Sequence, residues 1–165
     1  MHFDINKIEE LDVSDTEITE LLTEVYVDSG FVTHEMAKSL FVASSIRQRG
    51  LIIGARDVEN HEFSGMIIVV YPESAECRFD NGKEVEFHLL GVISKYRNKG
   101  LGKLLVTKAI EEVCNRGYPS ILLATQNKMY AAHKLYESLG FERKEALDFN
   151  RGKLCFLVYE KVICF

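Results

Sequence analysis

The stretch LGVISKYRNKGLGK, Leu90–Lys103, decides the fold prediction because it joins an expected strand to the start of an expected helix. Gly100 and Gly102 allow the backbone to approach a ligand closely and to adopt unusual dihedral angles. The following helix presents unpaired N–H groups and the positive end of its dipole. Three basic side chains add positive charge there: Arg97, Lys99 and Lys103. This combination predicts an anion site suited to a pyrophosphate.

Two other phosphate-binding motifs do not fit this stretch. A Walker loop needs Ser or Thr after its lysine and a glycine five positions before the second glycine, but Leu104 follows Lys103 and Arg97 stands at the first glycine position. A dinucleotide fingerprint needs a third glycine, and Leu105 occupies that place. The site is therefore of another kind.

The flanking sequence predicts a mixed α/β (α+β) fold. Apolar residues of 101–115 fall on one stripe of a helix that Gly117 ends, and Ser14 or Asp15 is expected to cap the first helix. Gly140 followed by Phe141 predicts a Schellman ending. The predicted strands are a first one near 3–8, then 51–55, 62–71, 83–93 and 120–125, and two closing strands over 142–146 and 153–162. The predicted helices cover 15–26, 33–45, 101–115 and 129–139. Residues 72–82, which contain Asp80, Asn81 and Gly82, are predicted to form a hairpin connection.

This order of elements predicts a single domain, residues 1–165, with one central sheet of about six or seven strands and about four helices. Of the 165 residues, 47% are apolar, which is enough for one core. No apolar run approaches the roughly 20 residues that span a bilayer. The acidic start lacks a signal-peptide segment, so we expect a cytoplasmic protein that does not bind membranes.

The distribution of charge and cysteine narrows the classes of ligand. A net charge of −5 does not favour nucleic acid as a partner. Residues 1–28 hold nine acids and one lysine, whereas 87–110 hold five bases and no acid. A basic patch on an acidic protein suggests a small polyanion. Four widely spaced cysteines without a CxxC pair predict free thiols, and no metal site is expected. They are Cys77, Cys114, Cys155 and Cys164.

With these motifs the chain resembles the GNAT superfamily of N-acetyltransferases over about residues 50–160. The family signature, Arg/Gln-x-x-Gly-x-Gly/Ala after a Leu-x-Val strand end, is similar to Arg97–Gly102 after Leu90–Val92. A second family element, Ala-x-x-Leu-Tyr-Glu-x-x-Gly-Phe, is similar to Ala132–Phe141. The two elements stand in the family's order with a strand between them.

The resemblance implies acetyl-CoA as co-substrate and a set of cofactor contacts. Main-chain groups of Leu90 and Val92 would meet the pantetheine arm and the acyl carbonyl, and Ala132 would leave space beside the arm. The pyrophosphate would be held by the backbone of Asn98, Lys99, Gly100, Leu101, Gly102 and Lys103, with charge added by Arg97. Many members have Asn seven residues before the tyrosine, where this chain has Met129; Asn127 is the nearest asparagine and a weaker candidate contact.

Acyl transfer to an amine needs a base, a donor to the oxyanion and a proton for the leaving thiolate. Strand alternation puts Glu86, His88 and Leu90 on one face. Glu86 lies six residues before Val92, where some GNAT enzymes keep a base glutamate, so we expect it to be the base, directly or through water. His88, with its near-neutral pKa, is the alternative base. The Val92 N–H is the expected oxyanion donor.

Tyr136 is the expected general acid, because the resemblance directs it to the thioester sulfur and its reference pKa near 10 is close to that of an alkyl thiol. The acids of the first helix would flank the acceptor site and favour a cationic amine. They are Glu17, Glu20, Glu24 and Asp28.

The sequence therefore predicts an enzyme that moves an acetyl group from acetyl-CoA to a primary amine by direct attack in a ternary complex. An idle acyl-CoA-binding or sensing module is the alternative, and a small interaction domain without a cofactor is a third reading. The acceptor amine and the length of the acyl group stay open, and a homodimer is a further possibility.

Overall fold

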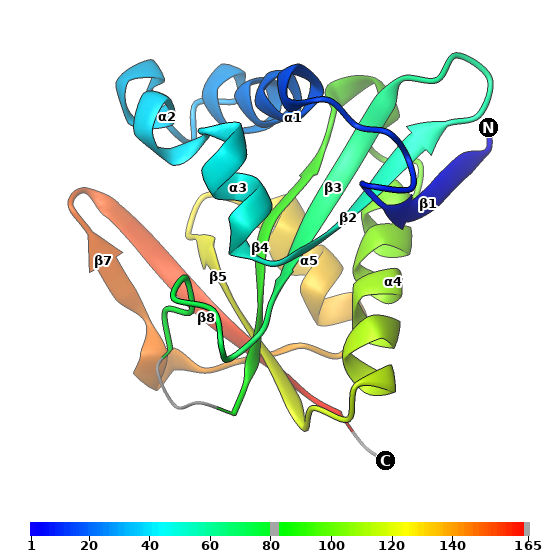
Figure 1. The fold of residues 1–165 in the computed structure, drawn as a ribbon. Helices are drawn as coiled ribbons and strands as arrows, with labels where there is room; N and C mark the ends of the chain where they lie inside the picture. Colours follow the sequence, from blue (N-terminus) through cyan, green and yellow to red (C-terminus); the bar gives the residue numbers. More distant parts are fainter. Residues whose placement is uncertain (80–82, 164–165) are drawn as a thin grey trace.

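The computed structural model describes residues 1–79 and 83–163 of the chain. One mixed sheet runs through this part, with helices on both of its faces (Figure 1). The strands are β1 (Phe3–Lys7), β2 (Leu51–Asp57), β3 (Phe63–Val70), β4 (Val85–Val92), β5 (Ser120–Gln126), β6 (Glu142–Arg143), β7 (Phe149–Arg151) and β8 (Leu154–Val162). The α-helices are α1 (Asp15–Leu22), α2 (His34–Leu40), α3 (Ala43–Arg49), α4 (Leu101–Asn115) and α5 (Tyr130–Ser138).

The strands follow the order β1-β2-β3-β4-β5-β8-β6, and β7 pairs with β8. Every pairing is antiparallel except that of β4 with β5. The predicted α/β fold class is thus confirmed. The expected connection over 72–82 joins the antiparallel strands β3 and β4, although its turn residues Asp80, Asn81 and Gly82 lie outside the described residues.

The structure adds elements that the sequence pattern did not separate. The helix expected over 33–45 is two helices, α2 and α3, that meet at Phe41 and Val42. The C-terminal region contains an extra short strand, β7, which forms a hairpin with β8 around Gly152 at φ 60°. The described residues consequently hold eight strands and five α-helices.

Local sequence signals set the helix ends as expected. Ser14 caps α1 in a reciprocal capping box with Glu17. At the end of α5, the Phe141 N–H donates to the Tyr136 carbonyl and the Gly140 N–H to the Glu137 carbonyl, which is the predicted Schellman motif. The rings of Tyr136 and Phe141 pack 5.7 Å apart. The motif therefore fixes the position of the Tyr136 ring.

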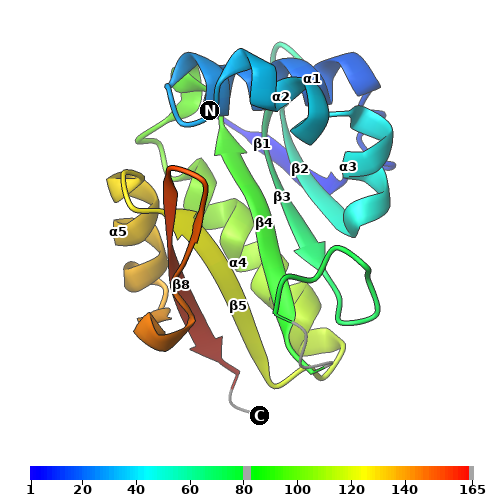
Figure 2. The same cartoon turned by 90° about the vertical axis from the view of Figure 1, so that its left-hand side faces the viewer.

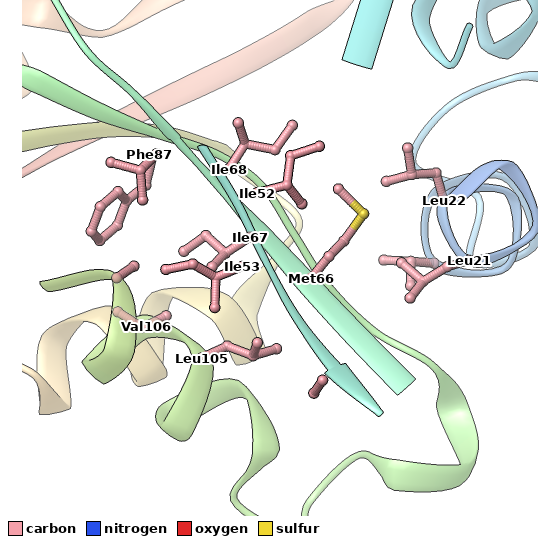
Figure 3. Packing of buried hydrophobic residues seen from close by; sticks show 14 of the residues in the cluster. Leu21, Leu22, Ile52, Ile53, Met66, Ile67, Ile68, Phe87, Leu105 and Val106 are labelled. Atoms are coloured by element: carbon pink, nitrogen blue, oxygen red, sulfur yellow. The ribbon is translucent and has the colours of Figure 1, made fainter. Parts of the chain in front are cut away.

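The core lies on both faces of the sheet. Figure 3 shows Leu21 and Leu22 of α1 on one side of β2 and β3, and Leu105 and Val106 of α4 on the other. Five consecutive residues of β3, Met66–Val70, are fully buried between these layers. The helix α1 continues into a six-residue π-helical turn, Thr23–Asp28, labelled η1 below.

A β-bulge interrupts β4 next to the site. Met66 pairs with Gly91 and Ile68 pairs with His88, so Leu89 and Leu90 together oppose one residue of β3. Leu89 has φ 50°, an unusual value for a leucine. The even alternation expected through Leu90 therefore ends at His88.

The bulge also ends the pairing of β4 with β5. These two strands pair only from Val85 to Phe87 on β4 and from Ile121 to Leu123 on β5. Beyond that point β5 continues beside β8, while β4 turns away, as Figure 2 shows. The strands form a V, whose opening we call the β4–β5 split.

Candidate active site

Two connected cavities flank the β4–β5 split. The first, which we call the inner cavity, has a volume of about 450 Å³ and lies among α2, β4, β5, α5 and the segment before β4. The second, the loop groove, has a volume of about 550 Å³ and follows the turn between β4 and α4. Four residues line both, and so the cavities meet there. These residues are Tyr26, Leu90, Met129 and Ala132.

The loop groove is built for an anion. Gly100 is the N-cap of α4 at φ 82°, and no side chain caps the helix. The first N–H groups of α4 are therefore left for a ligand, at the positive end of the helix dipole. A Cβ on Gly102 would lie 3.2 Å from the Leu135 side chain of α5, so glycine also lets the two helices approach. Arg97 and Lys103 line the same groove.

Main-chain groups of the bulged strand face this opening. The Ile93 N–H donates to the Ser64 carbonyl of β3, which makes the neighbouring pair of Val92 and Gly65 a non-hydrogen-bonded one. The Val92 N–H and carbonyl consequently point away from β3. The carbonyl accepts from Arg97 Nε at 3.0 Å.

Most of the predicted cofactor residues come together in the loop groove. Its lining includes Leu90, Val92, Arg97, Asn98, Gly100, Leu101, Gly102, Lys103 and Ala132. Two predicted contacts line neither cavity. Lys99 places its Nζ 5.8 Å from the Tyr96 ring, and Asn127 is exposed with its N–H donating to the Cys155 carbonyl.

Glu86 is buried and fully engaged. Its side-chain oxygens accept from the main-chain N–H groups of Arg78 and Phe79, and Oε1 lies 2.9 Å from Nε2 of His88. Burial acts to raise the pKa of the Glu86 carboxyl, but these hydrogen bonds outweigh burial and hold the pKa below its usual range. Glu86 is thus a carboxylate, and it is absent from the lining of the inner cavity.

His88 lines the inner cavity directly. Burial lowers the pKa of its imidazole; the hydrogen bond to Glu86 opposes this, but the charge of Arg78 adds to it, and the pKa lies below the ordinary 6.5. The neutral ring donates Nε2–H to the carboxylate, which leaves a lone pair on Nδ1. This Nδ1 is buried and has no hydrogen-bond partner within the described residues.

Two tyrosines line the inner cavity, and one of them, Tyr26, also lines the loop groove. The Tyr26 hydroxyl, on η1, donates to the Leu90 carbonyl at 2.9 Å. Tyr136 lines the inner cavity, and its hydroxyl has no hydrogen-bond partner in residues 1–79 and 83–163. Burial raises the pKa of both phenols, so both are neutral proton donors at physiological pH.

The acids of the first helix were expected to flank the acceptor site, but they do not reach the inner cavity. None of Glu17, Glu20, Glu24 and Asp28 lines the inner cavity. Glu17 pairs with Arg56 at 2.7 Å, and Glu24 accepts from the Ser94 N–H and hydroxyl. The expectation of a cationic acceptor, which rested on those acids, is therefore not supported by their positions.

Sequence reasoning missed the polar residues that do line the inner cavity. Arg49, Arg78 and Arg151 come from three separate segments, and Gln126 is the last residue of β5, where it pairs with Phe156 of β8. No local spacing links these residues, because only the folded sheet brings their segments together. Tyr26 is placed by the π-helical turn, which apolar periodicity does not reveal.

Comparison with known proteins identifies the family. Residues 16–141 match the model of the acetyltransferase (GNAT) family, and the chain belongs to that family. It is 48% identical over 58 residues to N-acetylaspartate synthetase of Xenopus tropicalis, which covers 35% of this chain and 21% of that protein. It is 39% identical over 75 residues to N-alpha-acetyltransferase 30 of Xenopus laevis; this match covers 43% of this chain and 28% of that protein. The matches thus span 21% and 28% of the length of these two relatives.

Solved structures share the fold along nearly the whole chain. A GNAT-family acetyltransferase from Staphylococcus aureus has a TM-score of 0.75 at 16% identity, with 98% of this chain and 99% of that chain covered. The PaiA N-acetyltransferase of Thermoplasma acidophilum, solved in complex with coenzyme A, has a TM-score of 0.72 at 18% identity, with 99% and 100% covered.

The described residues contain no cluster of His, Cys, Asp and Glu that could hold a metal ion. In 1–79 and 83–163, no helix has the length and apolarity to cross a bilayer.

The electrostatics of His88 are expected to be measurable by NMR. The imidazole should titrate with a midpoint below 6.5, because burial and the charge of Arg78 both disfavour its protonation. Arg78→Gln removes the positive charge of Arg78 and should raise the midpoint of the His88 titration, which is followed by the ¹⁵N shifts of the ring. Arg116→Gln is the control, since that guanidinium stacks on Tyr71 outside both cavities. A midpoint above 6.5, or one that ignores Arg78, would contradict this account.

Proposed function

We propose that this chain is an N-acetyltransferase that moves the acetyl group of acetyl-CoA to a primary amine by direct attack in a ternary complex. The observation that carries the proposal is the buried, unpartnered Nδ1 of His88, which Glu86 orients into a cavity that joins an anion-binding groove. A buried polar atom without a partner is costly, and such atoms are concentrated at functional sites.

The loop groove fits the coenzyme. Its uncapped helix N-terminus and basic side chains suit a pyrophosphate, and the opening along Leu90 and Ala132 leads from there to the inner cavity. Support also comes from the related fold of PaiA, whose structure contains coenzyme A. The relatives' names specify an N-acetylated product or N-alpha-acetyl transfer, which favours nitrogen as the acceptor atom.

The roles follow from the contacts. His88 Nδ1 accepts a proton from the attacking amine as the C–N bond forms. The Val92 N–H, which faces the split, stabilises the oxyanion. As the C–S bond breaks, the free Tyr136 hydroxyl gives its proton to the thiolate. Burial raises the pKa of Tyr136, and desolvation in the same cavity would also raise the pKa of the departing thiol.

The assignment of the base differs from the first expectation. The pKa of Glu86 is held below its usual range, and its two carboxylate oxygens already accept hydrogen bonds from three groups. Glu86 is therefore a poor proton acceptor. We therefore assign it as a positioning residue that selects the Nε2–H tautomer of His88. Direct attack is favoured because none of the described cysteines lines either cavity; Cys77, Cys114 and Cys155 all lie elsewhere.

Coenzyme binding is tested through two glycines with the same backbone geometry. Gly100 and Gly117 stand at opposite ends of α4 at φ 82° and 78°. Acetyl-CoA at a hundredfold excess over Kd should stabilise the protein by about 2.7 kcal/mol. Gly100→Leu should abolish the resulting rise in Tm, because a side chain there blocks the backbone; Gly117→Leu should keep it. Equal rises in both variants would place the coenzyme elsewhere.

His88 and Glu86 are substituted separately to test which of them is the base. His88→Gln should lower kcat by about 10²–10⁴-fold, the usual range for general acid–base catalysis, with little change in acetyl-CoA affinity. Glu86→Gln presents an amide N–H to Nε2, which forces the ring into the other tautomer; kcat should fall and the ¹⁵N shifts should report the switch. Retained turnover in His88→Gln, with loss in Glu86→Gln, would restore Glu86 as the base.

Tyr136 is tested by Tyr136→Phe, which keeps the ring contacts with Phe141 and removes only the hydroxyl. We expect kcat to fall within the same 10²–10⁴-fold range, with unchanged acetyl-CoA affinity and Tm. Full turnover in a well-folded variant would eliminate Tyr136 as the acid. If wild-type protein binds acetyl-CoA but acetylates no amine, the chain is instead the idle binding module.

A further inference from the structure

Three arginines converge on the inner cavity from segments that are far apart in the sequence. Arg49 lies in the last turn of α3, Arg78 in the segment before β4, and Arg151 at the end of β7. Arg49 and Arg78 are partly buried, and the Arg78 guanidinium lies 5.9 Å from the Phe156 ring centroid. All three line the same cavity as His88.

These guanidinium groups lack anionic partners among the residues that the structure describes. Within 1–79 and 83–163, none of the three belongs to an ion pair, and Arg49 Nε is buried without a hydrogen-bond partner. Elsewhere in the protein, Arg47, Arg56 and Arg143 each pair with a carboxylate. The arginines of the inner cavity are therefore a distinct set.

The cavity carries excess positive charge. Among the described residues that line it, Glu76, which is exposed, is the one carboxylate, against three guanidinium groups. Glu86 is nearby, but its oxygens are taken by His88 and two main-chain N–H groups. Burial lowers the pKa of both Arg49 and Arg78. The charge of Glu76 opposes this at Arg49, whereas the charges of neighbouring arginines lower the pKa further at both residues. Buried like charges are costly, and an anion placed among them would offset that cost.

The size and the remaining lining of the cavity restrict the anion. A volume of about 450 Å³ suits a small molecule. Met36, Leu40 and Phe41 supply apolar surface beside the arginines. Planar guanidinium groups match a carboxylate with paired hydrogen bonds. The phosphates of the coenzyme have their own cations, Arg97 and Lys103, in the loop groove on the other side of the split.

We propose that the acceptor is a small amine that also carries a carboxylate, an amino acid or a close analogue, and that Arg49, Arg78 and Arg151 bind its carboxylate while its amine faces Nδ1 of His88. This assignment rests on the proposed acetyl transfer. The acceptor charge that it requires is opposite to the one expected from the acidic first helix. The groups that line the cavity, and not the acids of that helix, decide which ligand enters it.

The test compares amines that carry a carboxylate with amines that lack one. Purified full-length protein with acetyl-CoA is assayed for thiol release with mono- and dicarboxylic amino acids, their amides, and the diamine putrescine. The carboxylates should have kcat/KM values at least tenfold above those of their amides, with putrescine lowest. Preference for amides or for putrescine would overturn the inference and leave acetyl transfer intact.

Variants locate the preference. Arg78→Gln should raise KM for the carboxylate acceptor by about 10- to 100-fold, as expected for loss of a hydrogen bond to a charged group, and reduce the advantage over the amide. Arg78→Lys should restore part of it. Arg116→Gln, outside both cavities, should change neither value. An unchanged ratio of carboxylate to amide in Arg49→Gln, Arg78→Gln and Arg151→Gln would overturn the role of the arginines.

Calorimetry separates the failure of this inference from that of the proposed function. The best carboxylate acceptor and its amide are titrated into protein loaded with coenzyme A. Carboxylate-selective binding without turnover of any amine would support the anion site and refute acetyl transfer. Turnover without that selectivity would refute the anion site alone, and absence of both would refute both proposals.

Discussion

The site depends on the early end of hydrogen bonding between β4 and β5. Only three residue pairs join these central strands, because the bulge at Leu89 and Leu90 turns β4 away. A continuous ladder would fill the middle of the sheet with paired main-chain groups. The separation instead exposes the Val92 main chain and leaves room for both cavities. The cost of the unusual Leu89 conformation is tolerated where structure on both sides supports it, as is common at functional sites.

The segment before β4 combines two tasks. Its main-chain N–H groups at Arg78 and Phe79 bind Glu86, while the Arg78 side chain lines the inner cavity. The orientation of His88 and the charge of the acceptor side therefore depend on one stretch of backbone. Burial is the main cause that lowers the pKa of His88, and the charge of the same arginine adds to it. A bound carboxylate would offset that charge and make Nδ1 a stronger proton acceptor.

Local signals predicted the elements and the loop groove, whereas contacts between distant segments determined the rest. The bounds of α4 were predicted to the residue, because its apolar stripe, the glycines before it and Gly117 all act within a few positions. The break between α2 and α3 has no glycine or proline to mark it. The bulge was invisible because alternation through Leu90 looks regular. Alternation placed His88 and Glu86 on one face, but the engagement of the Glu86 carboxylate depends on N–H groups seven and eight residues away.

The turn η1 joins the two halves of the site. Three residues of this turn and its C-cap make hydrogen bonds to the site. The Glu24 carboxylate accepts from the Ser94 N–H, and the Tyr26 hydroxyl donates to the Leu90 carbonyl. The Ser29 hydroxyl accepts from Arg97. A ligand that orders the turn between β4 and α4 thus also steadies a wall of the inner cavity. Coupling of this kind is reciprocal, so each substrate would raise the affinity for the other by the same factor. The consequence would be cooperative loading of the two cavities: whichever ligand binds first lowers the entropic cost of ordering the wall that the other one needs.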